Sequence, residues 1–140
     1  MIFKQCNAEV VGLHDFFVAW FRGTIGKSEK NFQRLSSVLA AEFEIIKPDG
    51  SRLDRKGLFD DLWAFHGAYQ DIAFNIEIKN YQFRPIKEES FIVTYEEWMQ
   101  LENKFDARMS TAIFSSKKDT QNGVEWLHVH ETLLPGFHTQ

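Results

Sequence analysis

The sequence predicts the α+β class, with a curved antiparallel sheet wrapped around N-terminal helices in a cone-like shape. Apolar residues recur at helical spacing through residues 7–65, and from residue 72 onward apolar and polar residues alternate. Short polar breaks divide the second half, and strands joined by such short loops pair antiparallel. A length of 140 residues, 44% of them hydrophobic, predicts one domain over residues 1–140, with its core at about 8–135.

Three helices are expected in the first half of the chain. The first covers residues 7–24, with Asn7 as its N-cap and Gly23 at its end. Ser28 is the N-cap of a shorter second helix, and Asp54 that of a third. Both follow segments that cannot continue a helix, including the Pro-Asp-Gly turn before the third. The first helix carries its apolar stripe at Val10, Leu13, Phe16, Phe17, Trp20 and Phe21.

The strands of the second half follow a period of two. Ile72, Phe74, Ile76 and Ile78 alternate with polar or small residues, as in a strand with one buried face. Pro85 and the charged run after it indicate a turn. A short strand at 42–46 precedes the third helix, and the later strands are expected at 91–100, 105–115 and 124–134.

Composition excludes several classes of partner. A net charge of −4 without a basic segment argues against nucleic acid. No run approaches the 18 apolar residues of a membrane span. The chain has a single cysteine, Cys6, and its first residues lack the apolar segment of a signal peptide, so a cytoplasmic location is expected. No glycine-rich phosphate or dinucleotide motif is present, so no cofactor is expected.

The order of elements resembles the nuclear-transport-factor-two-like (cystatin-like) superfamily, and within it the SnoaL-like branch. The likeness rests on three local patterns: Phe43 followed five residues later by Pro-Asp-Gly, the run Tyr95-Glu96-Glu97-Trp98, and the last strand with Trp126 and His130. The resemblance implies a cone that hosts isomerases, dehydratases, ligand binders or assembly modules. Enzymes of this superfamily carry an Asp or His base inside the cone. The aspartates here fall in turns, caps and strand ends, so no catalytic residue is assigned.

A carboxylate and a guanidinium are the main candidate site. Glu96 and Glu97 point to opposite faces of one strand, so only one can enter the cone. A two-residue turn at Glu102-Asn103 places Glu97 opposite Arg108. If the loop differs in length by one residue, Glu96 takes that position instead. The pair either orients a polar ligand or forms an ion pair on the outer face.

Two histidines lie on the expected last strand. His128 and His130 are two residues apart, so they share a face. A metal needs further ligands that the sequence does not supply, and no metal site is predicted. His130 is expected inside the cone, either hydrogen-bonded in the core or in contact with a ligand.

Aromatic residues make up 15% of the chain, which predicts a ring-rich interior. Trp20, Trp63, Trp98 and Tyr95 are candidate ligand contacts, with core packing as the alternative. Two functions follow: a small-molecule binder, extending to a cofactor-free lyase or isomerase, or a non-catalytic assembly module with a filled cone.

The partner expected besides a small organic ligand is a second copy of the chain. Phe91 and Val93 point to one face of their strand and Ile92 to the other, so apolar residues reach both faces of the sheet. An outer apolar face predicts a homodimer.

Overall fold

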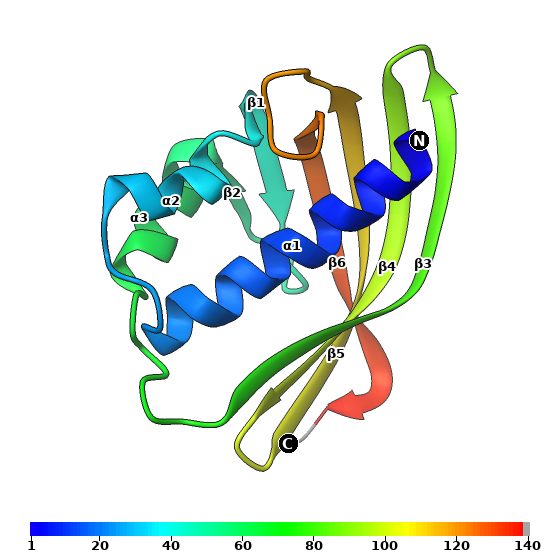
Figure 1. Cartoon of the computed structure of the whole chain (residues 1–140). Coiled ribbons are helices and arrows are strands. Elements are labelled where there is room, and N and C mark those ends of the chain that lie inside the picture. The colour runs from blue at the N-terminus through cyan, green and yellow to red at the C-terminus, as the bar shows by residue number, and fades with distance from the viewer. Residues whose placement is uncertain (139–140) are drawn as a thin grey trace.

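The computed structural model describes residues 1–138, and it confirms the predicted fold class. Three helices pack on one face of a curved, six-stranded open sheet, and α1 runs diagonally across the concave side (Figure 1). The helices are α1 (Ile2–Arg22), α2 (Glu29–Ser36) and α3 (Arg55–Ala64). The strands are β1 (Leu39–Ile46), β2 (Arg52–Asp54), β3 (Phe74–Lys87), β4 (Ser90–Leu101), β5 (Lys104–Ser116) and β6 (Val124–His138).

The helix caps agree with the sequence except at the start of α1. Asn7 is not an N-cap, because α1 already begins at Ile2. Ile2 and the fully buried Cys6 extend the apolar stripe toward the N-terminus, so the helix continues where its packing continues. The side chains of Ser28 and Asp54 cap α2 and α3 as predicted, each accepting from a backbone N–H three residues on.

The sheet has the order β2-β1-β6-β5-β4-β3. Strands β3 to β6 form the predicted antiparallel meander, and β1 joins β6 in parallel. The predicted turn forms within the charged run, at Glu88 and Glu89, and its expected start at Pro85 is wrong, because β3 runs through this proline to Lys87. β3 is an edge strand, and there a missing N–H need not remove a ladder hydrogen bond.

Two irregularities decide which side chains face the helices. In β3 the pairing shifts between Lys79 and Gln82, where Asn80 has φ 54°, so one extra residue is accommodated. In β6, Trp126 pairs with Phe114 while His128 pairs with Ile113, which leaves Leu127 as an extra residue. A bulge of this kind reverses the in-and-out alternation beyond it.

The core lies between the helices and the concave face. Trp20 is fully buried, stacks on Phe16, and donates a hydrogen bond from Nε1 to the Leu62 carbonyl oxygen (2.6 Å). Trp63 packs against Trp20 and Phe32 in the same group of rings. None of the described helices is both long and apolar enough to cross a bilayer.

A buried carboxylate ties α1, α2 and the start of β6 together. Glu9 is fully buried and accepts two hydrogen bonds from Arg34, at 3.0 and 3.1 Å. It also accepts from Asn122 Nδ2 (3.0 Å) and from Trp126 Nε1 (2.8 Å). With both oxygens occupied and its charge paired, Glu9 acts as a structural anchor.

Candidate functional site

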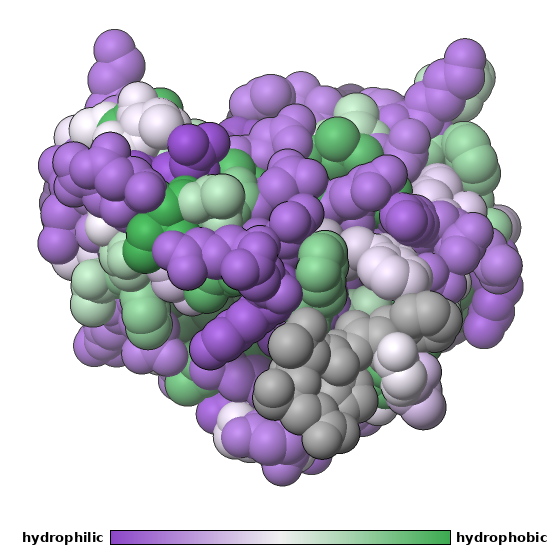
Figure 2. Space-filling model, turned by 90° about the horizontal axis from the view of Figure 1, so that it is seen from below, coloured by the Kyte–Doolittle hydropathy of each residue, from purple (hydrophilic) through white to green (hydrophobic). Residues whose placement is uncertain are grey.

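The cone contains a cavity of about 500 Å³. Side chains from all three helices and five of the strands line it, and most of them are apolar. Two of the lining residues, Phe65 and Phe105, are 52% and 51% exposed to solvent. The apolar wall of the cavity therefore reaches the surface at its rim. Seen from below, apolar residues interrupt the polar surface (Figure 2). The cavity is therefore an open, apolar-walled pocket.

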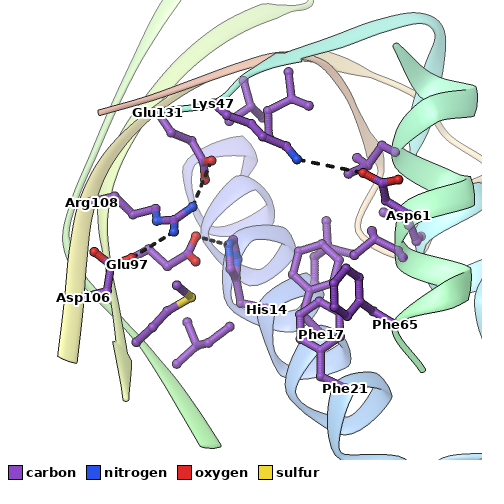
Figure 3. Close-up of a pocket in the computed structure, with 18 of the residues that line it drawn as sticks. His14, Phe17, Phe21, Lys47, Asp61, Phe65, Glu97, Asp106, Arg108 and Glu131 are labelled. Carbon is purple, nitrogen blue, oxygen red and sulfur yellow. Dashed lines mark hydrogen bonds and ion pairs between the residues drawn. The ribbon is translucent and has the colours of Figure 1, made fainter. Parts of the chain in front are cut away.

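A buried histidine and glutamate stand at one side of the cavity. His14 of α1 donates from Nδ1 to the Val10 carbonyl oxygen (2.7 Å), and its Nε2 lies 3.0 Å from Glu97 Oε1 (Figure 3). Burial alone would lower the pKa of His14, but the charge and hydrogen bond of Glu97 outweigh it and raise that pKa. Burial likewise opposes ionisation of Glu97, yet His14 and then Arg108 bring its pKa below the usual value. The two side chains form a buried ion pair.

Arg108 of β5 forms the second half of this cluster. Its Nη2 donates to Asp106 Oδ2 (2.9 Å) and its Nη1 to Glu131 Oε1 (3.3 Å). Its Nε is buried without a hydrogen-bond partner among the described residues. The guanidinium is therefore held by carboxylates from two adjacent strands, β5 and β6.

Glu131 has a strongly perturbed protonation equilibrium. Burial, followed by repulsion from Glu97, raises its pKa to about 7, against the attraction of Arg108 and His14. Tyr95, fully enclosed beside these groups, has its pKa raised well above the usual value, first by burial and then by the two glutamates. At neutral pH the cluster thus contains a carboxyl group that readily gains or loses a proton.

Aromatic rings form the opposite wall. Phe17 and Phe21 of α1 stack with ring centres 6.1 Å apart, and Phe65 contacts Phe21 edge-on (Figure 3). At the rim, Lys47 and Asp61 approach to 3.9 Å, both substantially exposed. The cavity therefore has a charged side and a ring-lined side.

Three of the predicted site residues line this cavity. Tyr95, Glu97 and Arg108 are among its wall residues. The two-residue turn forms as expected, because Leu101 pairs with Lys104 and Glu97 pairs with Arg108. The choice between the two glutamates is thereby settled in favour of Glu97. Its position opposite Arg108 is confirmed, although its hydrogen bond goes to His14.

The other predicted residues lie elsewhere. The interior position expected for His130 is wrong: the bulge at Leu127 turns it outward, where it is exposed, and turns Glu131 inward. His128 is half-buried on the same outer face. Glu96 and Trp98 are also on the convex face, where Trp98 Nε1 donates to Glu96 Oε1 (2.9 Å). Trp20 and Trp63 belong to the core and are absent from the cavity wall.

His14, Asp106 and Glu131 were not predicted. His14 follows Leu13 on the apolar face of α1, and a polar residue within such a stripe is a usable signal. Glu131 has no comparable signal, because its inward direction depends on the bulge. Within residues 1–138 no three metal-ligating side chains come together.

The fold is the nuclear-transport-factor-two-like, cystatin-like fold, as comparison with solved structures shows. An NTF2-like protein of unknown function from Pseudomonas aeruginosa superposes with a TM-score of 0.81 at 19% identity, covering 93% of this chain and 98% of that one. The association domain of CaMKII from C. elegans gives 0.62 at 17% identity, covering 92% and 96%.

The family is shown by sequence. Residues 6–135 match the sucrose-6-phosphate phosphohydrolase C-terminal family, and the chain belongs to it. The chain is 28% identical over 129 residues to sucrose-phosphatase 1 and to sucrose-phosphatase 2 of Nicotiana tabacum. These matches cover 91% of this chain but only 30% of each relative, so the chain spans about a third of their length.

Proposed function

We propose that this chain binds a small organic ligand in the cavity of its cone. The observation that carries the proposal is an open space of about 500 Å³ with charged groups gathered on one side. Ligand sites commonly have this volume and this combination of apolar wall and a few placed polar groups. A cone filled by side chains would instead favour a purely structural module.

The narrower, SnoaL-like proposal is a cofactor-free lyase or isomerase. It is supported by Glu131, whose carboxyl group has a pKa of about 7 and lines an apolar cavity. A general acid or base works best when its pKa lies near the working pH. Glu131 is therefore the proposed proton-transfer group, with His14, Glu97 and Arg108 setting its protonation.

The family suggests a second ligand to test. The curated relatives are sucrose-phosphatases, and this chain matches only part of them. We propose sucrose and sucrose 6-phosphate as test compounds on that basis alone. The cavity itself gives a phosphate little support, because both terminal amino groups of Arg108 are already paired with carboxylates.

Assembly is the alternative function, and it can coexist with ligand binding. The convex face carries Ile92 and Ile113, which pair across β4 and β5 and are half-buried. We propose a homodimer through this face of a single-domain, cytoplasmic chain. The proposed homodimer is supported by the similarity of this fold to that of an association domain.

Ligand binding is tested by filling the cavity. Met99 lines it, two residues beyond Glu97 on the same face of β4. Some compounds that bind the wild-type protein will change its backbone amide NMR chemical shifts and raise its melting temperature. Met99→Trp should abolish both effects. Gln100→Trp, at an exposed position on the opposite face, is the matched control and should leave them unchanged. If no compound of a broad library binds, or Met99→Trp binds them all equally, the proposed function is wrong.

A further inference from the structure

We infer that the cavity selects a positively charged ligand: an ammonium group carried on an apolar body the size of one or two rings. This inference rests on the proposed function, since it names the ligand class of the same cavity. It follows from which hydrogen-bonding groups the protein has already used and which remain for a ligand.

The cationic groups of the cluster are already engaged. Arg108 directs one terminal amino group to Asp106 and the other to Glu131. His14 uses one ring nitrogen on the Val10 carbonyl oxygen and the other on Glu97. An anionic ligand would have to displace a carboxylate from these partners, and the displaced carboxylate would then be left buried without a positive charge.

The carboxylates of the cluster can still accept hydrogen bonds from a ligand. The contacts described above engage one oxygen of each carboxylate, namely Glu97 Oε1, Asp106 Oδ2 and Glu131 Oε1. An ionised carboxylate accepts at both oxygens, so each retains an acceptor that can meet a ligand donor. Glu97 and Glu131 are only 6% and 9% exposed, so solvent competes little for those positions. Among the described residues, three acceptor oxygens thus stand against one unpaired buried donor of the cluster, Arg108 Nε.

The charge balance points the same way. The cluster contains two positive groups, His14 from α1 and Arg108 from β5. It contains three carboxylates, which are Glu97 from β4, Asp106 from β5 and Glu131 itself from β6. At the rim Lys47 and Asp61 offset one another, and Lys104 is exposed, where solvent screens its charge. Burial first and repulsion from Glu97 second raise the pKa of Glu131, and an ammonium group beside the two carboxylates would offset the repulsion.

The opposite wall suits the rest of such a ligand. Phe17, Phe21 and Phe65 face the charged side across the cavity (Figure 3). An aromatic or aliphatic ring buries apolar surface against them, and their faces also attract a cation. The cavity volume of about 500 Å³ holds an indole ring with a short chain.

The test uses three compounds with one ring system and three charges: tryptamine, tryptophol and indole-3-acetate. Isothermal titration at pH 7 should show tryptamine binding at least about tenfold more tightly than tryptophol, with indole-3-acetate weakest. Sucrose and sucrose 6-phosphate are titrated alongside, so that a sugar ligand is detected directly.

Proton release provides a second readout. Because the pKa of Glu131 is about 7, the group is near half-protonated at pH 7, and a bound ammonium favours its ionised form. Tryptamine binding should release roughly half a proton at pH 7, seen by comparing buffers of different ionisation enthalpy. Its affinity should rise about tenfold from pH 6 to pH 8, since tryptamine itself stays charged in that range. Any proton lost by His14 adds to the release.

The matched variants are Glu131→Gln and Glu96→Gln. The first should remove most of the pH dependence and of the preference for tryptamine over tryptophol. The second changes a half-buried glutamate on the convex side of β4 and should alter neither. Equal binding of tryptophol, tighter binding of indole-3-acetate or sucrose 6-phosphate, or no binding of tryptamine overturns the inference. The proposed function survives those results as long as some compound binds in a manner that Met99→Trp abolishes.

Discussion

Glu97 and Arg108 occupy directly opposed positions on β4 and β5, yet neither is the hydrogen-bond partner of the other. Glu97 accepts from His14 of α1, while Arg108 donates to Asp106 on its own strand and to Glu131 on β6. The charges of Glu97 and Arg108 still attract each other, and that attraction joins α1, β4, β5 and β6 into one electrostatic unit.

Replacing Arg108 by leucine should destabilise the protein by roughly 3 kcal/mol, because it leaves Asp106 and Glu131 without their shared positive charge in a largely enclosed site. Arg52→Leu is the matched control, since Arg52 pairs with Glu44 at the surface; its change should stay below about 1 kcal/mol. Urea unfolding at pH 7 measures both. Equal effects would mean that the Arg108 contacts contribute no more than a surface ion pair.

Replacing Glu97 by glutamine should lower the pKa of His14. Burial lowers the pKa of this imidazole, and the charge and hydrogen bond of Glu97 are the largest contributions that oppose it, ahead of the Val10 hydrogen bond and the Glu131 charge. Without the charge of Glu97 the effect of burial should dominate. The pKa should fall below the ordinary histidine value, as measured by NMR titration of the ring resonances. Glu96→Gln changes the neighbouring residue on the other face and should leave the titration of His14 as it is in the wild type.

Glu131 should make the protein less stable as pH rises. Its pKa is about 7 in the folded state against the ordinary 4.5, so the folded protein holds this proton more tightly. The stabilisation is complete below pH 4.5 and is lost as pH rises through 7. As pH rises from 5 to 8, the unfolding free energy of Glu131→Gln should therefore increase by roughly 2 to 3 kcal/mol relative to that of the wild type. A constant difference in unfolding free energy across that range would contradict the raised pKa.

Glu9→Ala should cost about 3 to 5 kcal/mol, because it removes four hydrogen bonds and leaves the Arg34 guanidinium, 14% exposed, without its carboxylate. Glu44→Ala removes the exposed partner of Arg52 and should cost less than about 1 kcal/mol. Chemical denaturation compares the two. A small effect at Glu9 would show that α1, α2 and β6 are held together without this anchor.

A homodimer through the convex face should be visible by light scattering. The expected mass is twice 16.4 kDa at micromolar concentration. Ile113→Lys places a charge on that face and should shift the mass toward 16.4 kDa. A wild-type mass of 16.4 kDa would end this prediction.

Local patterns were sufficient for much of the fold. The caps at Ser28 and Asp54 and the left-handed Gly23 after α1 depend on a few neighbouring residues, so the sequence specifies them. The opposition of Glu97 and Arg108 also follows from a short segment, because a two-residue turn fixes the register of the hairpin.

The remainder of the site depended on tertiary structure. His14 meets Glu97 across 83 residues of sequence, and the curvature of the sheet over α1 brings the two together. One extra residue at Leu127 turns His130 to solvent and Glu131 into the cavity. The sequence determined the helices, the meander and one opposed pair, because each rests on contacts between near neighbours. Only the tertiary structure decided which charges share the cavity, since long-range packing sets both the bulge and the placement of α1.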